Sequence, residues 1–407
     1  MIAWNLVLKN IRGYRKRSVV TVVLSAITTA LLVFSTAWMD GSHNAMIKSA
    51  VEIYPGYLQI THRDFRKTPG YENLIFDLDS LKRNLKRVPG IASFGARFET
   101  YVLYSTEARS VGGMLTGIEP RAEEHLSQLA SSLYEGEYLD DTDKAAVYIG
   151  FELAKRLKVG IGDELAFIGN GADYSLAADV VKIKGTFRTG LFEFDSSAAF
   201  MNKTYLDQIM VSENIATHVI VLPENTKKCE ELAAVLNLEL GEENLAESWL
   251  TSMSALVQAM TLDSVFGYIT LGIIFIVIFF VIMIYTLLSV HARVREVGVM
   301  RALGTTPWGI FSMLISESIL LSLVGVLIGG LLGACAAYYF HLNPVEFPGY
   351  EEQFKQYNMA AIAIPADFAP LIILRDMLVM FVLCVVSTLY PIVRLNRYRP
   401  MEAIRHV

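Results

Sequence analysis

The chain lacks the short motifs that mark many nucleotide-hydrolysing, metal-dependent and acyl-transferring enzymes. Its 407 residues contain no G-x-x-x-x-G-K-[ST] phosphate loop, no H-E-x-x-H, no C-x-x-C and no G-x-S-x-G. The chain therefore does not hydrolyse ATP through a phosphate loop of its own. Its seven histidines stand singly, and we expect them at surfaces or interfaces rather than as metal ligands. The sequence predicts no catalytic site, no metal site and no cofactor in this chain.

Cysteine is scarce as well. The three cysteines, Cys229, Cys335 and Cys384, are too few and too far apart for a disulfide framework. Cys335 and Cys384 fall in apolar runs, where we expect them to act as small buried apolar residues. Cys229 lies in the large polar region, and we expect it to be a free thiol.

Charge is also low, and the apolar residues are clustered. The chain is 53% hydrophobic and 19% charged, whereas soluble domains average about 45–50% and about 25%. Long apolar runs occupy residues 18–39, 264–290, 314–340 and 377–393. Each approaches or exceeds the roughly 18–20 residues that cross a hydrocarbon core of about 30 Å. The sequence thus predicts four transmembrane helices.

Basic residues gather beside these runs. Residues 1–17, 291–313 and 394–407 carry net charges of +5, +2 and +3 within a chain of net charge −6. Basic segments next to membrane spans remain on the cytoplasmic side. All three segments fall on one side if there are four spans, which predicts cytoplasmic N and C termini.

The first run has a basic flank, as a secretory signal peptide does. Its apolar stretch of about 22 residues exceeds the usual 7–15, and it lacks a clean small-x-small cleavage pattern before Asp40. We therefore expect a retained anchor. Within the spans, ionisable residues are confined to Glu317, Arg375 and Asp376. A proton-coupled carrier usually has such residues deep in its helices, so the sequence does not favour that class.

These patterns predict an α-helical membrane protein with four transmembrane helices and a large α+β extracytoplasmic domain inserted between helices 1 and 2. The amphipathic start, with Trp4 and Leu6 among basic residues, suits a helix in the membrane interface. The predicted segments are a cytoplasmic interfacial helix 1–17, transmembrane helix 1 at 18–39, the extracytoplasmic domain with its stalk at 40–263, transmembrane helix 2 at 264–290, a cytoplasmic coupling segment 291–313, transmembrane helix 3 at 314–340, an extracytoplasmic loop 341–370, transmembrane helix 4 at 371–393 and a cytoplasmic tail 394–407.

The large insert contains both kinds of secondary structure. Runs rich in β-branched and aromatic residues predict strands at 57–60, 101–104, 180–184 and 218–222. Helices are predicted at 76–88, before the stop signal Pro89-Gly90, and at 150–157. Residues 251–262 read as a helix continuous with the second span.

Two features of the third span have alternative interpretations. Gly325, Gly329 and Gly333 form small-xxx-small steps that predict close packing against the second span or a partner subunit; the alternative is ordinary tolerance of glycine in membrane helices. Glu317 either bonds to the loop or tail and transmits motion, or pairs near the headgroups with a basic neighbour such as Arg301 or Arg394. We favour the second interpretation of Glu317.

The stretch 291–308 carries the most specific pattern. It resembles the cytoplasmic motif R-x-x-E-[IV]-G-x-x-[RK]-A-[LIM]-G of MacB/FtsX-like permeases. The matching residues are Arg293, Glu296, Val297, Gly298, Arg301, Ala302, Leu303 and Gly304. The tail resembles the family's P-x-x-A-L-R ending, with Ile404 in place of leucine, and Pro391 is expected to end the last span.

This segment is interpreted as the element that couples the chain to a separate ATPase. Val297, Met300 and Leu303 are expected to form an apolar ridge flanked by Arg293 and Arg301, which docks in a groove of the cytosolic partner. The alternative, a basic loop that merely fixes topology, does not require Gly298, Gly304 or ordered apolar positions.

The insert resembles that of lipoprotein-releasing permeases of the LolC/LolE type. The resemblance rests on the order of its motifs, at 56–60, 115–120, 135–139, 147–150, 159–163 and 184–190. It implies a permease subunit in the inner membrane, paired with itself or a similar subunit and with two copies of an ATPase that binds ATP and Mg. Lipoproteins, a periplasmic carrier and the bilayer, but no nucleic acid, are the implied partners. The alternatives are export of another substrate, such as a peptide, drug or glycolipid, and mechanical control of an extracytoplasmic hydrolase.

Overall fold

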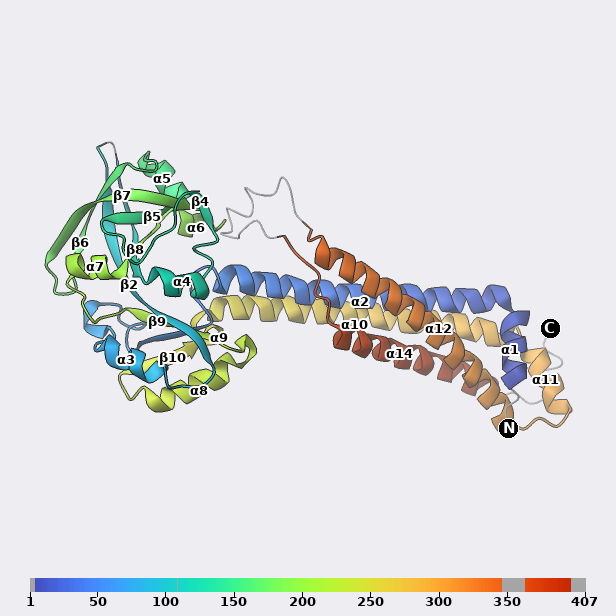
Figure 1. The fold of residues 1–407 in the computed structure, drawn as a ribbon. Coiled ribbons are helices and arrows are strands. Elements are labelled where there is room, and N and C mark those ends of the chain that lie inside the picture. Colours follow the sequence, from blue (N-terminus) through green and yellow to red (C-terminus); the bar gives the residue numbers. More distant parts are fainter. Residues whose placement is uncertain (1–3, 108, 346–362, 397–407) are drawn as a thin grey trace. The chain divides into compact units, whose positions relative to one another are not determined.

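The computed structural model describes residues 4–107, 109–345 and 363–396 (Figure 1). It divides into a helical unit, within residues 1–44, 260–345 and 364–407, and an α/β unit, formed mainly by residues 45–259. The predicted tail motif at 399–405 and most of the predicted loop 341–370 lie outside the described residues.

Four long apolar helices have the length and composition to cross a membrane: α2 (Arg15–Val51), α10 (Ser254–His291), α12 (Pro307–Leu342) and α14 (Pro370–Asn396). The four predicted apolar helices are therefore present. The short helix α9 (Trp249–Ser252) precedes α10, and the two are separated at Met253. The predicted continuity of residues 251–262 with the second apolar run is confirmed from Ser254 onward, and the break at Met253 separates only the first residues of the predicted helix.

The helical unit packs around side chains from all four long helices. Leu32, Ile282, Val326 and Met380 form one buried cluster together with Cys384. Two shorter helices, α1 (Trp4–Gly13) and α11 (Val294–Ala302), complete the unit.

The last apolar helix does not end where the sequence suggested. Pro391 lies inside α14, which continues to Asn396. The prediction that Pro391 ends the span is wrong, because neighbouring helices and hydroxyl side chains allow an apolar helix to contain a proline. The hydroxyls of Ser387 and Thr388, in the turn before Pro391, donate to backbone carbonyl groups of the same helix.

Among the residues that the structure describes, the α/β unit contains ten strands: β1 (Leu58–His62), β2 (Ile91–Ser105), β3 (Ser110–Ile118), β4 (Leu133–Gly136), β5 (Ala146–Gly150), β6 (Glu164–Asn170), β7 (Leu176–Phe187), β8 (Ala198–Asn202), β9 (His218–Pro223) and β10 (Asn244–Ser248). Its α-helices, besides α9, are α3 (Leu78–Leu85), α4 (Pro120–Leu126), α5 (Phe151–Leu157), α6 (Phe192–Asp195), α7 (Lys203–Met210) and α8 (Cys229–Glu239). Short 3₁₀ helices occur at η1 (Tyr71–Asn73) and η2 (Thr226–Lys228). The four predicted strands and two predicted helices all fall on observed elements of the same type.

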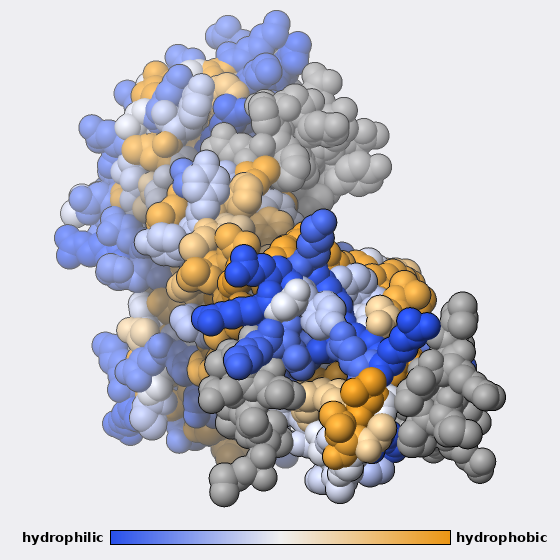
Figure 2. Space-filling model, turned by 90° about the vertical axis from the view of Figure 1, so that its right-hand side faces the viewer, coloured by the Kyte–Doolittle hydropathy of each residue, from blue (hydrophilic) through white to orange (hydrophobic). Residues whose placement is uncertain are grey.

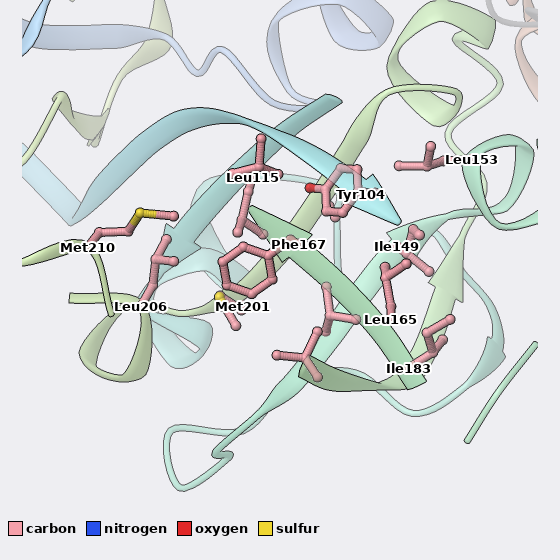
Figure 3. Packing of buried hydrophobic residues seen from close by; sticks show 14 of the residues in the cluster. Tyr104, Leu115, Ile149, Leu153, Leu165, Phe167, Ile183, Met201, Leu206 and Met210 are labelled. Carbon is pink, nitrogen blue, oxygen red and sulfur yellow. The ribbon is translucent and has the colours of Figure 1, made fainter. Parts of the chain in front are cut away.

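Six of these strands close into a ring. The pairings run β2–β3–β8–β5–β7–β6 and return from β6 to β2. The interior holds buried side chains such as Tyr104, Leu115, Phe167 and Met201 (Figure 3). A closed ring leaves no free edge among its members, which removes sites where another chain could add a strand.

The N-terminal half of β2 belongs to a second layer. There it pairs with β9, which continues through β1 to β10. Helix α3 covers this layer with Leu78, Leu81 and Leu85, spaced to share one helix face. The side chain of Asp77 caps α3 by accepting from the amide of Ser80. Strand β2 is therefore shared by the two cores of the unit.

A buried ion pair marks the centre of β2. Arg97 is fully buried, and its guanidinium donates to both carboxylate oxygens of Glu123 at 2.6 and 3.0 Å. It also donates to the carbonyl of Tyr54 at 2.6 Å and lies 4.1 Å from the centre of that ring. Tyr54 follows the end of α2, so this network fixes the start of the α/β unit to β2 and α4.

Candidate functional site

The chain reverses direction between α10 and α12 through a short helix with well-defined ends. Helix α11 ends at Ala302, and Gly304 adopts φ +94°, the left-handed conformation that favours glycine. Thr306 then caps α12 by accepting from the amide of Gly309, and Pro307 occupies the first helical position. The local sequence thus encodes a helix stop followed at once by a helix start.

One face of α11 packs into the chain's own core. Val294, Val297 and Gly298 are buried, and Met300 is partly buried against the same cluster. The other members of the cluster come from the ends of α10, α12 and α14: Val290, Ile310, Met313, Leu314 and Ile392. The predicted ridge is therefore wrong in one respect: Val297 is 5% exposed and is not available to a partner.

The opposite side of the segment exposes a different set of apolar residues. Val299 is 52% exposed, Leu303 82% and Trp308 74%. We call these three residues the exposed coupling face. Leu303 belonged to the predicted ridge, whereas Val299 and Trp308 were missed. The sequence does carry a signal for two of these residues. Val299 and Leu303 are four residues apart, and a spacing of four places side chains on the same side of a helix and its C-terminal end.

The start of α11 is fixed by a buried ion pair with α12. Arg293 donates from Nη1 to Oε2 of Glu317 at 2.9 Å, and the two side chains are 4% and 6% exposed. Burial alone would lower the pKa of Arg293, but the charge and hydrogen bond of Glu317 raise it above the ordinary arginine value. Glu317 therefore bonds to the segment before α11. Arg301 and Arg394, the partners suggested for it, are not those observed.

Tyr14 joins this pair to the junction between α1 and α2. Its hydroxyl donates to Glu296, and the Arg293 guanidinium lies 4.6 Å from the centre of its ring. The hydrogen bond to Glu296, aided by burial, raises the pKa of Tyr14. The Nε atom of Arg293 also lies 3.4 Å from Glu296. Tyr14 was not identified from the sequence, because a contact across 282 residues leaves no local pattern.

The remaining predicted coupling residues do not form a single patch. Arg301 is partly buried and Gly304 is exposed. Glu296 is about half exposed and faces Tyr14 and Arg293. The segment thus combines a buried anchoring side with an exposed apolar side.

The predicted glycine stripe lies against α2. A Cβ atom added to Gly325 would lie 2.6 Å from Ser25 Cβ, and one added to Gly329 would lie 2.2 Å from the carbonyl oxygen of Ala26. A Cβ on Gly333 would lie 2.9 Å from the carbonyl oxygen of Ala30. The glycines allow two helix backbones to approach closely, but the neighbour is the first apolar helix. The sequence had suggested the second span or another subunit.

The described side chains of this segment suit contact with another protein better than metal binding. Within residues 4–107, 109–345 and 363–396, no three His, Cys, Asp or Glu side chains are grouped so as to hold a metal ion. The geometry offers a short helix with one buried, anchored side and exposed apolar side chains at Val299, Leu303 and Trp308.

Comparison with known proteins finds a family match over residues that include this segment. Residues 268–400 match the FtsX-like permease C-terminal family. The lipoprotein-releasing system transmembrane protein LolC of Xylella fastidiosa (strain 9a5c) is 23% identical over 330 residues, which are 78% of each chain. The LolC protein of Neisseria meningitidis serogroup B is 22% identical over 403 residues, covering 93% of this chain and 91% of that one.

Solved structures match part of the chain. The periplasmic region of MacB from Actinobacillus actinomycetemcomitans covers 52% of this chain and 95% of its own, with 13% identity and a TM-score of 0.37. The extracellular domain of the ABC-type transporter YknZ from Gram-positive bacteria covers 47% of this chain and 99% of its own, with 17% identity and a TM-score of 0.34.

Proposed function

The chain carries an FtsX-like permease domain over residues 268–400, and from this premise we propose that it couples a separate ATPase to movements on the far side of the membrane. Permeases of this type are subunits of ATP-binding cassette transporters. The segment 291–313 is the proposed point of contact with the ATPase.

The exposed coupling face carries this proposal. Val299, Leu303 and Trp308 expose large apolar side chains on and just after a short helix. Large apolar side chains exposed within a short stretch of chain are suited to a protein contact site. A short helix with exposed apolar side chains on it and just after it can dock in a groove on a partner protein.

The buried side of the segment supports transmission of motion. Arg293 and Glu317 tie the start of α11 to α12, and Val297 anchors α11 in the cluster that includes α10 and α14. Protein interiors are closely packed, so a displacement of one buried side chain is transmitted to its neighbours. A partner that moves α11 therefore moves the ends of three apolar helices with it.

The proposed topology follows from the basic segments. The N and C termini and α11 lie in the cytoplasm, and residues 40–263 lie in the periplasm between the first two spans of the inner membrane. A second permease subunit and two ATPase copies, which bind ATP and Mg, complete the assembly. This chain is a non-catalytic subunit.

The proposed cargo is a lipoprotein released from the inner membrane, as the names of the LolC relatives suggest. Each buried CH₂ of a lipid anchor contributes about 0.8 kcal/mol to membrane binding. Removal of several acyl chains therefore requires an external source of energy, and ATP hydrolysis by the partner supplies it. A periplasmic carrier then receives the released lipoprotein.

The contact with the ATPase is tested by the double variant Val299→Asp with Leu303→Asp. Both side chains point away from the chain's own core, so the protein should still insert while the ATPase no longer co-purifies. The matched control is Val235→Asp with Leu238→Asp, two exposed apolar residues of α8 that are 45% and 87% exposed. Normal recovery of the ATPase with the Val299/Leu303 variant would refute the assignment.

The cargo is tested separately by a mild-detergent pull-down from native membranes followed by mass spectrometry. Acylated lipoproteins bound together with a phosphate-loop ATPase support lipoprotein release. An ATPase bound with a hydrolase or another exporter component would retain the coupling mechanism and reject this cargo.

A further inference from the structure

One face of α2 exposes a continuous apolar stripe. Val19, Val23, Ile27 and Leu31 are 58%, 46%, 55% and 55% exposed. Their spacing of four places them on nearly the same side of the helix. In a helix that crosses a membrane, such a stripe is suited to contact with acyl chains.

The stripe ends in exposed cationic residues. Arg15 precedes Val19 by four residues and is exposed on the same side. Lys16 precedes Val20 in the same way, and Val20 is also exposed. With a rise of about 1.5 Å per residue, Arg15 lies roughly 6 Å along the axis from the first lipid-facing valine. Cations about one helical turn before an apolar stripe are well placed to reach phospholipid headgroups.

Helix α1 adds two further cations. The Asn10 amide contacts Met313, and Ile11 packs against the cluster around α11, so these residues hold α1 against the helical unit. Lys9 and Arg12, three residues apart, remain exposed. We call Lys9, Arg12, Arg15 and Lys16 the basic elbow, since they flank the junction between α1 and α2.

No acidic residue among those that the structure describes neutralises the basic elbow. Residues 1–17 contain no Asp or Glu, and none of the four side chains takes part in an ion pair among the residues that the structure describes. Glu296, the acidic side chain bonded to Tyr14 at this junction, already interacts with Arg293. Figure 2, which faces the end of the helical unit that carries α1 and α11, shows strongly hydrophilic side chains gathered beside hydrophobic ones.

We propose that the basic elbow binds the headgroups of anionic phospholipids. Four unpaired cations at headgroup depth, on a face whose continuation contacts acyl chains, fit a lipid with a negatively charged headgroup. Each Lys or Arg near a membrane surface attracts anionic lipid. A soluble protein partner fits less well, because the stripe continuing from Arg15 is apolar and belongs to a helix long enough to cross a membrane. Membrane sidedness and ATPase binding are not required for this inference.

The test measures lipid retention by the full-length protein, without the ATPase. The protein is reconstituted in nanodiscs of phosphatidylcholine with phosphatidylglycerol, and retained lipids are counted by native mass spectrometry. The wild-type protein should retain phosphatidylglycerol preferentially, and high salt should reduce the preference because it screens exposed charge. The double variant Arg15→Gln with Lys16→Gln should lower the preference at least about fivefold.

The control is Lys86→Gln with Arg87→Gln, an exposed cationic pair of the α/β unit, which should leave the preference unchanged. If the Arg15/Lys16 variant does not insert, Lys9→Gln with Arg12→Gln tests the same surface outside the long apolar helix. No phosphatidylglycerol preference in the wild-type protein, or equal preference in the variants, would overturn the proposal. Unchanged lipid retention, with loss of the ATPase in a separate pull-down from native membranes, would overturn the proposal and assign the surface to the protein partner.

Discussion

The Nη1 atom of Arg293 lies 2.9 Å from Oε2 of Glu317, with both side chains almost fully buried. Arg293 precedes α11, whereas Glu317 lies within α12. The pair therefore attaches the proposed coupling helix to an apolar helix through charge as well as through packing. The ring of Tyr14 stacks on the same guanidinium, which adds the junction of α1 and α2 to the contact.

Replacing Glu317 by Gln should destabilise the helical unit by about 3–5 kcal/mol, because Arg293 is left buried without its full counter-charge. Thermal unfolding in detergent, followed by circular dichroism, measures the effect. Glu296→Gln is the matched control, since Glu296 is about half exposed and an exposed pair contributes about 0–1 kcal/mol. Similar losses in the two variants would contradict the buried-pair interpretation.

The double variant Arg293→Met with Glu317→Met separates charge from packing. It removes both charges and keeps apolar volume, so much of the stability lost in Glu317→Gln should return. If stability returns but stimulation of the ATPase does not, the ion pair contributes to coupling beyond its effect on folding.

Replacing Gly329 by Ala should destabilise the contact between α2 and α12 by about 1–3 kcal/mol. The new Cβ would lie 2.2 Å from the carbonyl oxygen of Ala26, so one of the two helices has to shift. Gly272→Ala is the control, because a Cβ there meets nothing within 4 Å. Thermal unfolding should distinguish the two alanine variants, and equal melting temperatures would refute the close contact.

His218 should make the α/β unit less stable in mild acid. Burial, with the nearby charges of Arg97 and Arg66, lowers its pKa from 6.5 to about 3. Below pH 6.5 the unfolded chain binds a proton that the folded chain does not, so stability falls with falling pH. Between pH 7 and pH 5 the loss should be about 2 kcal/mol.

Proteolysis-monitored unfolding within residues 45–259 measures this slope. His218→Gln should flatten it relative to the wild-type protein, whereas replacement of the exposed His125 should not. Buried carboxyl groups such as Glu99, whose pKa is raised by burial, change stability with pH in the opposite direction to His218. Their contribution is the same in both proteins, so the difference between wild type and His218→Gln reports on His218 alone. The same slope in wild type and His218→Gln would contradict the prediction.

Cys229 should react slowly with alkylating reagents. It is 2% exposed, its thiol lies 2.8 Å from the carbonyl oxygen of Thr226, and burial raises its pKa to about 11. Thiolate is the reactive form, so at pH 8 alkylation of the native protein should be at least about 100-fold slower than in denaturant. The rate is measured by mass spectrometry with Cys335 and Cys384 replaced by Ser. Fast labelling of the native protein would show that α8 opens.

Local features of the sequence predict many of the elements. Asp77 and the leucine spacing after it encode α3, and the sequence from Gly304 to Pro307 encodes a helix stop and start. Apolar length identified the four long helices. Each of these depends on residues within a few positions of one another, where the hydrogen bonding and spacing of a helix apply.

The inward face of α11 could not be read in this way. The helix carries apolar residues on both sides, with Val297 on one and Val299 on the other. The choice between them depends on Ile310 and Ile392, which pack against Val297. Patterning within nine residues therefore predicted a coupling ridge but assigned the wrong valine to it.

The sequence by itself determined the number of long apolar helices, the α+β character of the insert and the place of the short helix between two apolar runs. Tertiary structure decided that Glu317 pairs with Arg293, that the glycine stripe meets α2, and that β2 joins a closed ring. The physical reason is the difference in sequence distance over which the interactions act. Backbone propensity and side-chain spacing act over one or two helical turns, whereas the partner of a buried charge or a glycine surface is set by whichever distant segment fills the space.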